Sequence, residues 1–386
     1  MKTIWLVPLE KIETRYTYEW ADHIPKMIEQ YCADQGMSFF GFDSNWDQRA
    51  GVPAADIHLV NVLGSLPEQT ASSGAFINFA STNVWKATQS SKIAEFFHNG
   101  FVNPGDVFYF TDSWNPTIIQ VKYMSELLNI PVTIVGQWHA GWHDPYDFLG
   151  RTIKNPNWVS RFEASLFHAI DVNLFTTESY RDMFYTNLDK QLSMTYSDFL
   201  AKTMRVGYPN SYLETSLGKY FDQPKEDIIL FPHRIAPEKQ LEIFKDLEQQ
   251  FRELGKNTQF IVCQEKQLTK AEYHELLGKS KVVFSAALQE TYGIAQTEAV
   301  FAGAIPCSPD RLSYSEMYSP DFLYPSSFTA SWQEYLKHRK ALVSILIDMV
   351  ENSELYTTEL PAARQHLRDN YIGDTGICKL LVKGEK

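Results

Sequence analysis

The chain has 386 residues, 44% of them hydrophobic, so it can bury two cores of ordinary size and we expect two domains. Its formal net charge is −12, and the acidity is shared, with 15 basic and 22 acidic side chains in residues 1–210 and 20 and 25 in the remainder. This balance argues against a broad basic platform for nucleic acid, although a local patch built by folding is invisible in such a sum.

The chain shows no sequence signal for secretion or for a membrane span. The apolar run Ile4 to Leu9 is too short for the hydrophobic region of a signal peptide, and no stretch approaches the ~20 apolar residues of a spanning helix. Four cysteines without a Cys-x-x-Cys pair favour reduced thiols over a structural zinc site. We therefore expect a soluble cytoplasmic protein, in the host cytoplasm if a phage encodes it, with no membrane insertion.

Short apolar runs alternate with longer helical segments along the first half of the chain. The predicted strands are Lys2 to Val7, Met37 to Phe42, Ile57 to Val62, Val107 to Thr111, Val132 to Gln137 and Val172 to Thr176. The predicted helices are residues 19–35, 83–99, 116–129 and 177–188. Such alternation is typical of a doubly wound sheet of parallel strands.

A second alternating series follows a Gly-, Ser- and Pro-containing segment, residues 209–226, which we interpret as an interdomain linker. Its strands are expected at Ile228, Phe260, Val282 and Ala304, and two closing helices at about 330–353 and 355–370. The predicted domains are residues 1–208 and residues 209–370, followed by a terminal segment, residues 371–386.

Ligands of doubly wound folds bind at the carboxyl ends of the strands, which directs attention to the loop after Val132 to Gln137. This loop contains two histidines, two tryptophans and two aspartates within residues 137–147. His143 and Asp144 are candidate acceptor contacts, and Trp142 a candidate stacking wall. The alternative, a metal site of His139, His143 and Asp144, is disfavoured because Gly141 and Pro145 indicate a loop rather than a helix.

Two further loops of the first domain carry candidate acceptor-binding residues. In the loop from Glu10 to Tyr18, Arg15 and Tyr16 are candidates, with an ordinary surface loop as the alternative. Asp112 follows the strand ending at Thr111, where it could accept a proton or a hydrogen bond. Capping of the next helix is the more common role for such an aspartate.

The densest motif lies in the second half, where Glu290 and Glu298 stand eight residues apart around an expected helix start. The unpaired N–H groups of Thr291, Tyr292, Gly293 and Ile294 would carry a partial positive charge suited to a phosphate. At ~1.5 Å rise per residue, the two carboxylates can span roughly 10 Å, about the reach from a sugar ring across a diphosphate to a ribose. This geometry suits a nucleotide-sugar.

A second motif follows the apolar run Ile228 to Phe231, which is typical of a buried strand. Arg234 and Lys239 come next and flank the expected start of a helix, with Pro237 placed in its first turn, where a missing N–H costs nothing. On their own these are two cations near a loop. Their order and spacing before Glu290 make a shared site the better interpretation.

The two motifs together resemble glycosyltransferase family 4, whose members are retaining enzymes of the GT-B fold. The resemblance implies an α/β chain of two Rossmann-like, doubly wound domains facing a central cleft, with the end of the chain crossing back to the first domain. It also implies that Arg234 and Lys239 hold the donor diphosphate, that Glu290 binds the sugar and that Glu298 binds the ribose. His139 would contact the donor sugar, facing the acceptor.

The resemblance implies a retaining transferase that uses a nucleoside-diphosphate-sugar, with a UDP-sugar favoured, and needs neither a cofactor nor a metal. Glucose, arabinose and mannose are the expected sugars, and the hydroxyl of a modified nucleobase, such as 5-hydroxymethylcytosine in phage DNA, the expected acceptor. A tRNA nucleoside, a glycan, a lipid or a small metabolite remain alternatives, as does a noncatalytic sugar-nucleotide-binding protein. The family's Gly-Gly pair is absent after the first strand, which indicates a different acceptor mode.

Overall fold

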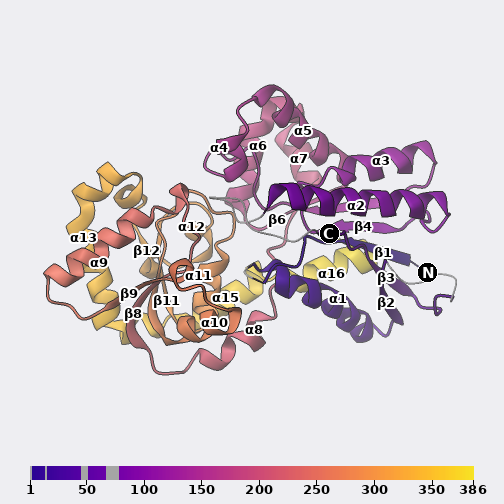
Figure 1. Ribbon diagram of the computed structural model, residues 1–386. Coiled ribbons are helices and arrows are strands. Elements are labelled where there is room, and N and C mark those ends of the chain that lie inside the picture. Colours follow the sequence, from indigo (N-terminus) through magenta and orange to yellow (C-terminus); the bar gives the residue numbers. More distant parts are fainter. Residues whose placement is uncertain (1, 14, 45–50, 67–77) are drawn as a thin grey trace. The chain divides into compact units, whose positions relative to one another are not determined.

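The computed structural model describes residues 2–13, 15–44, 51–66 and 78–386. The chain forms two compact units (Figure 1). Unit 1 contains Met1–Thr176, Arg181–Pro209 and Gly373–Lys386, and unit 2 contains Thr177–Tyr180 and Asn210–Ile372. The last residues of the chain therefore belong to the same unit as the first.

Unit 1 is built on a seven-stranded sheet with the order β2-β3-β1-β4-β5-β6-β7, and every pair of neighbours in it is parallel. The strands are β1 (Lys2–Val7), β2 (Phe39–Asp43), β3 (Ile57–Asn61), β4 (Val107–Phe110), β5 (Thr133–Gln137), β6 (Val172–Phe175) and β7 (Thr203–Arg205). The central strands read as continuous apolar runs because helices cover both faces of a parallel sheet.

The helices of unit 1 cover both faces of this sheet, α2 and α3 one face and α1 and α16 the other (Figure 1). They are α1 (Thr17–Asp34), α2 (Phe79–His98), α3 (Thr117–Leu127), α4 (Phe148–Thr152), α5 (Pro156–Ala169), α7 (Tyr196–Ala201), α16 (Asp374–Lys383) and α6 (Glu178–Leu192), which joins this unit from Arg181 onward. Helix α2 starts earlier than predicted because the Asn78 side chain caps it, accepting from the backbone N–H groups of Ala80 and Ser81. The helices α4, α5 and α7 were not predicted.

Unit 2 carries a five-stranded parallel sheet with the order β12-β11-β10-β8-β9. Its strands are β8 (Glu226–Phe231), β9 (Gln259–Val262), β10 (Ser280–Phe284), β11 (Ile305–Pro309) and β12 (Leu323–Tyr324). Its helices are α8 (Leu213–Ser216), α9 (Leu241–Glu253), α10 (Lys270–Lys279), α11 (Ile294–Phe301), α12 (Tyr314–Met317), α13 (Trp332–Glu351), α14 (Ser353–Thr357) and α15 (Leu360–Tyr371).

The segment predicted as an interdomain linker is folded into unit 2. It contains α8, a turn of 3₁₀ helix (Gly218–Tyr220) and the start of β8. The Lys225 ammonium donates to the carbonyl oxygens of Tyr220, Gly278 and Ala302, at 3.0, 2.7 and 2.6 Å. The linker interpretation was wrong because Gly, Ser and Pro also serve short turns that pack against a core.

All four cysteines have free thiols. Burial raises the pKa of the Cys263 thiol to about 12, and those of Cys307 and Cys378 are raised in the same way. No helix in the described part of the chain is both long enough and apolar enough to cross a membrane.

Candidate functional site

Two predicted motifs of unit 2 lie at the same edge of its sheet. Strand β8 has β10 on one side and β9 on the other, so the chain reverses its winding direction between β8 and β10. Ligands of open parallel sheets bind outside the carboxyl ends of the strands at such a switch point. Arg234 and Lys239 follow β8, and Glu290 follows β10, so the fold brings the two motifs together there.

An ion pair joins the motifs directly. The Lys239 ammonium lies 3.1 Å from Oε2 of Glu290 and donates to the carbonyl oxygen of Gln289 at 2.5 Å. Burial alone would raise the pKa of Glu290, but the Lys239 ammonium, His233 and a backbone hydrogen bond from Gly293 outweigh it, so the pKa lies below its usual value. Glu290 is therefore ionised at neutral pH and keeps one oxygen of its carboxylate unoccupied by Lys239.

His233 stays neutral beside this pair. Burial, together with the Lys239 and Arg234 cations, lowers the pKa of His233 to about 3, although the Glu290 carboxylate opposes the shift. A neutral imidazole adds no positive charge to the cluster. The positive charge next to Glu290 thus comes from Lys239 and not from His233.

Arg234 is held by a carboxylate that the sequence analysis did not single out. Its guanidinium forms an ion pair with Glu238, whose side chain is buried, while Arg234 itself is partly exposed. Between Arg234 and Lys239 lies a 3₁₀ turn (Pro237–Lys239), and α9 begins only after Gln240, which adopts a left-handed conformation. The expected helix start at Pro237 was therefore too early. The four-residue spacing of Arg234 and Glu238 was the sequence signal that could have predicted their ion pair.

The residues predicted to form the helix mouth divide into loop and helix. Thr291 and Tyr292 are buried loop residues, Gly293 caps α11 with φ at 75°, and Ile294 is the first helical residue. A Cβ on Gly293 would lie 2.5 Å from the Tyr314 ring, so this position requires glycine for both conformation and space. The unpaired N–H groups of α11 thus begin at Ile294, later than expected.

Glu298 lies on α11 with its carboxylate held from α10. Oε2 accepts a hydrogen bond from the Tyr273 hydroxyl at 2.7 Å, and Oε1 lies 3.5 Å from the Lys270 ammonium. Glu298 is only 4% exposed, and each oxygen of a carboxylate can accept a second hydrogen bond. Tyr273 and Lys270 were missed because they lie far from Glu298 in the sequence.

In unit 1 the switch point falls between β1 and β4, and His139 lies close to it. Its Nε2 donates to the carbonyl oxygen of Thr111 at 2.5 Å, and its Nδ1 meets the hydroxyls of Tyr208 and Tyr16 at 2.7 and 2.9 Å. Burial lowers the pKa of His139 despite the Asp112 carboxylate, so the ring is neutral with the proton on Nε2. With both nitrogens engaged, the ring anchors the loop after β5.

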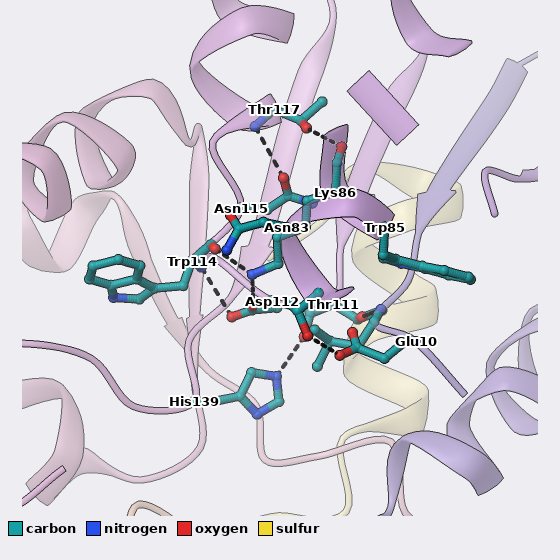
Figure 2. A network of polar contacts seen from close by, with 12 residues as sticks. Glu10, Asn83, Trp85, Lys86, Thr111, Asp112, Trp114, Asn115, Thr117 and His139 are labelled. Atoms are coloured by element: carbon teal, nitrogen blue, oxygen red, sulfur yellow. Dashed lines mark hydrogen bonds and ion pairs between the residues drawn. The ribbon is translucent and has the colours of Figure 1, made fainter. Parts of the chain in front are cut away.

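Figure 2 shows a polar network around Asp112, directly after β4. The Lys86 ammonium from α2 lies 2.8 Å from Oδ2 of Asp112, and Oδ1 accepts from the backbone N–H of Trp114 at 3.0 Å. Burial would raise the pKa of Asp112, but Lys86 and the other partners hold it below its usual value. Nearby, Glu10 is buried, accepts from the Thr82 hydroxyl and keeps Oε2 without a hydrogen-bond partner among the described residues.

The remaining residues of the His139 loop are tied down by a buried carboxylate, Glu163 of α5. Glu163 accepts from the Trp114 indole at 2.7 Å and from the backbone N–H groups of Trp142 and His143 at 2.6 and 3.0 Å. His143 and Asp144 are themselves buried, and their role as acceptor contacts stays a prediction. Glu163 was missed because nothing in the sequence links it to a loop some twenty residues earlier.

The side chains considered for a metal site do not form one. The rings of His139 and His143 have different partners, and the described part of the chain holds no group of three His, Cys, Asp or Glu side chains arranged around a common point. Arg15, the other predicted acceptor residue, lies beside Tyr16, with its guanidinium carbon 5.6 Å from the Tyr16 ring centre.

Comparison with known proteins gives a short sequence match and extensive structural matches. No protein-family model matches the chain. It is 38% identical to the tRNA-queuosine alpha-mannosyltransferase of Drosophila melanogaster, over 60 residues that make up 16% of each protein. Three solved structures superpose over nearly the whole chain. The pneumococcal O-GlcNAc transferase GtfA in complex with UDP and GlcNAc matches with a TM-score of 0.58 and 10% identity, over 99% of this chain and 98% of that one. The UDP-forming trehalose-phosphate synthase of Burkholderia vietnamiensis matches with a TM-score of 0.57 and 12% identity, over 99% of this chain and 98% of that one. Anabaena Alr3699/HepE in complex with UDP and glucose matches with a TM-score of 0.52 and 12% identity, over 100% of this chain and 99% of that one.

These structural neighbours establish the fold. The chain has two parallel-sheet α/β domains like those of the GT-B glycosyltransferases, which confirms the fold predicted from the sequence. At 10 to 12% identity the likeness carries over the fold and not the activity.

Proposed function

We propose that the protein is a retaining glycosyltransferase that moves a sugar from a UDP-sugar to a hydroxyl. The observation that carries the proposal is the charge arrangement at the carboxyl edge of unit 2, where Lys239 pairs with Glu290 and Arg234 pairs with Glu238 at the switch point. Two cations beside a helix N-terminus suit a diphosphate, and the carboxylates of Glu290 and Glu298 suit sugar and ribose hydroxyls. Two of the structural neighbours were solved with UDP bound.

In the proposed reaction, the bond between the anomeric carbon and the diphosphate oxygen breaks, and a bond from that carbon to the acceptor oxygen forms. The departing UDP takes the electron pair, and Arg234 and Lys239 stabilise its developing charge. The acceptor proton passes to the departing phosphate on the same face of the sugar, so the anomeric configuration is kept without an enzyme nucleophile. Glu290 orients the sugar ring and favours the positive charge that develops on it.

Unit 1 is the proposed acceptor domain, because its carboxyl edge presents hydrogen-bonding groups around a single ion pair. Lys86 and Asp112 neutralise each other there, and the ring of His139 is neutral. For the acceptor we propose the hydroxyl of a modified nucleobase, such as 5-hydroxymethylcytosine. The short match to a tRNA-nucleoside mannosyltransferase supports a nucleoside acceptor, whether in DNA or in tRNA.

The test is to incubate the purified protein with UDP-glucose, UDP-arabinose and GDP-mannose, together with plain DNA, hydroxymethylcytosine-containing DNA or tRNA that carries its natural modified nucleosides. The nucleic acid is then digested, and the nucleosides are analysed by mass spectrometry. A gain of one sugar mass on one nucleoside would identify donor and acceptor together, and NMR of the product gives the anomeric configuration. Absence of UDP or GDP release with every donor and acceptor would contradict the proposal.

A further inference from the structure

A stretch of unit 1 departs from the acidic character of the chain. Between Asp144 and Asp171 it has two carboxylates, Asp147 and Glu163, and both are buried. The same stretch carries three cations, Arg151, Lys154 and Arg161. The exposed charged side chains of this stretch are therefore all basic, in a protein whose formal net charge is −12. Residues 145–165 are called the basic strip below.

The basic strip also exposes large aromatic side chains. Trp158 is 50% exposed and Tyr146 is 49% exposed, although large aromatic side chains are usually more buried than this. Trp158 and Arg161 lie three residues apart on α5, so they share one face of the helix. Exposed aromatic rings beside cations are the combination that proteins use to bind single-stranded nucleic acid, with bases on the rings and phosphates on the cations.

Buried contacts hold the strip as a rigid platform. The Trp142 indole donates to the carbonyl oxygen of Ile153 at 3.0 Å, and Glu163 on the buried side of α5 accepts from the loop after β5. Gly150 packs so closely that a Cβ there would lie 2.0 Å from the carbonyl oxygen of Asp144. A binding surface that is already ordered loses little conformational entropy when a ligand docks.

The strip also begins at the edge of the sheet that a ligand would use. It starts eight residues after the end of β5, and the loop between them contains His139. Lys154 and Arg161 form no ion pair with any carboxylate in the described part of the chain. Arg151 donates through Nε to the carbonyl oxygen of Tyr146 at 3.0 Å, which links the cation to one of the exposed rings.

We infer that the basic strip binds a single-stranded segment of nucleic acid and so presents a nucleobase to the acceptor edge of unit 1. The inference rests on the proposed function, of which it specifies the acceptor as a polymer rather than a free nucleoside. An enzyme that modifies a base must act on a single strand or on a base turned out of the duplex, and stacking on Trp158 and Tyr146 suits either case. The acidic remainder of the surface would repel the strand and confine it to the strip.

Fluorescence anisotropy with the full chain tests this inference, using fluorescein-labelled dT20, rU20 and a 20-base-pair duplex. The triple variant Arg151→Ala, Lys154→Ala, Arg161→Ala should bind dT20 or rU20 at least tenfold more weakly, with a salt slope about two units smaller. Trp158→Ala should weaken binding about fivefold or more while leaving the salt slope unchanged, because stacking releases no counterions. Whichever of dT20 and rU20 binds more tightly indicates the kind of strand.

The matched control is the triple variant Lys245→Ala, Lys337→Ala, Lys340→Ala, which removes three exposed cations of unit 2 and should bind as the unaltered protein does. Equal loss in both triple variants, or no loss in either, would overturn the inference, as would tight binding to anionic lipid vesicles with none to dT20 or rU20. Circular dichroism confirms that each variant is folded. Release of UDP by the unaltered protein reports the proposed function separately, since the strip can bind nucleic acid even if no sugar is transferred.

Discussion

The two units each place a lysine–carboxylate pair at the switch point of a parallel sheet, but the surroundings of the pairs differ. In unit 2, Lys239 and Glu290 lie 3.1 Å apart, with Arg234 and the helix α11 close by in the same motifs. In unit 1, Lys86 and Asp112 lie 2.8 Å apart among hydroxyl groups and aromatic rings, including the anchored ring of His139. Both pairs hold the carboxylate pKa below its usual value.

The difference lies in what surrounds each ion pair. In unit 2 a second ion pair, Arg234 with Glu238, belongs to the same motif as Lys239, and the neighbouring helix end adds a partial positive charge. In unit 1 the lysine and the aspartate cancel, and the imidazole is neutral. The first arrangement suits a group that arrives charged and gains charge in the reaction, and the second suits an uncharged hydroxyl.

Removing the cation of the unit 2 pair should have the largest effect. Lys239→Met takes away a donor to the departing diphosphate and leaves Glu290 without its ion-pair partner, so kcat should fall about 10²- to 10³-fold. Initial rates of UDP release at saturating donor measure this. Lys245→Met, which removes an exposed lysine of α9, should leave the rate unchanged. A loss below roughly tenfold, about 1.4 kcal/mol, would contradict the phosphate role.

The Glu298 carboxylate gives the next largest expected effect. Charge-assisted hydrogen bonds contribute about 1.5 to 3 kcal/mol, so Glu298→Gln should weaken UDP binding roughly 10- to 100-fold in calorimetric titrations. Tyr273→Phe removes only the hydroxyl that positions Glu298 and should cost a few-fold in UDP affinity with kcat nearly constant. Glu275→Gln, on the exposed side of the same helix α10, is the control. Unchanged UDP affinity in Glu298→Gln would remove the ribose assignment.

The unit 1 pair should affect the acceptor and not the donor. Lys86→Met removes the ammonium that positions Asp112. The KM for the acceptor should therefore rise about tenfold, which corresponds to a free-energy change of about 1.4 kcal/mol. The Kd for UDP should stay constant. The exposed residue Lys26 of α1 provides the control variant Lys26→Met. If Lys86→Met weakened UDP binding and spared the acceptor KM, the division of labour between the units would be wrong.

Much of the fold could be predicted because its signals are local. Buried parallel strands are continuous apolar runs, and β1 begins and ends where the sequence predicts it. Boundaries were less accurate where a side chain or an unusual backbone angle decides them, as with the Asn78 cap of α2 and the left-handed Gln240 before α9. The folded segment at residues 210–226 was hidden by its turn-rich composition.

The candidate site divides in the same way. Arg234, Lys239, Glu290 and Glu298 stand in two short motifs, so their spacing alone singles them out, and their roles stay predictions. Glu163 and Tyr273 support the loops from helices elsewhere in the chain, and only the tertiary structure brings them there. The burial of His143 and Asp144 has the same cause, because packing and not residue type decides which side of a loop faces solvent.

The smallest expected effect concerns the pH dependence of stability, through the buried His233 beside the unit 2 pair. His233 has a pKa of about 3 in the folded protein and about 6.5 in the unfolded chain, so between these values only the unfolded chain binds the proton. Stability therefore falls as the pH falls, and lowering the pH from 6.5 to 5.5 should cost about 1 kcal/mol through His233. The variant His233→Asn lacks this proton and should show a flatter dependence in urea unfolding at the two pH values. His98→Asn, at an exposed histidine of α2, should keep the dependence of the unaltered protein, and an equal slope in all three proteins would show that His233 is not held neutral by its neighbours.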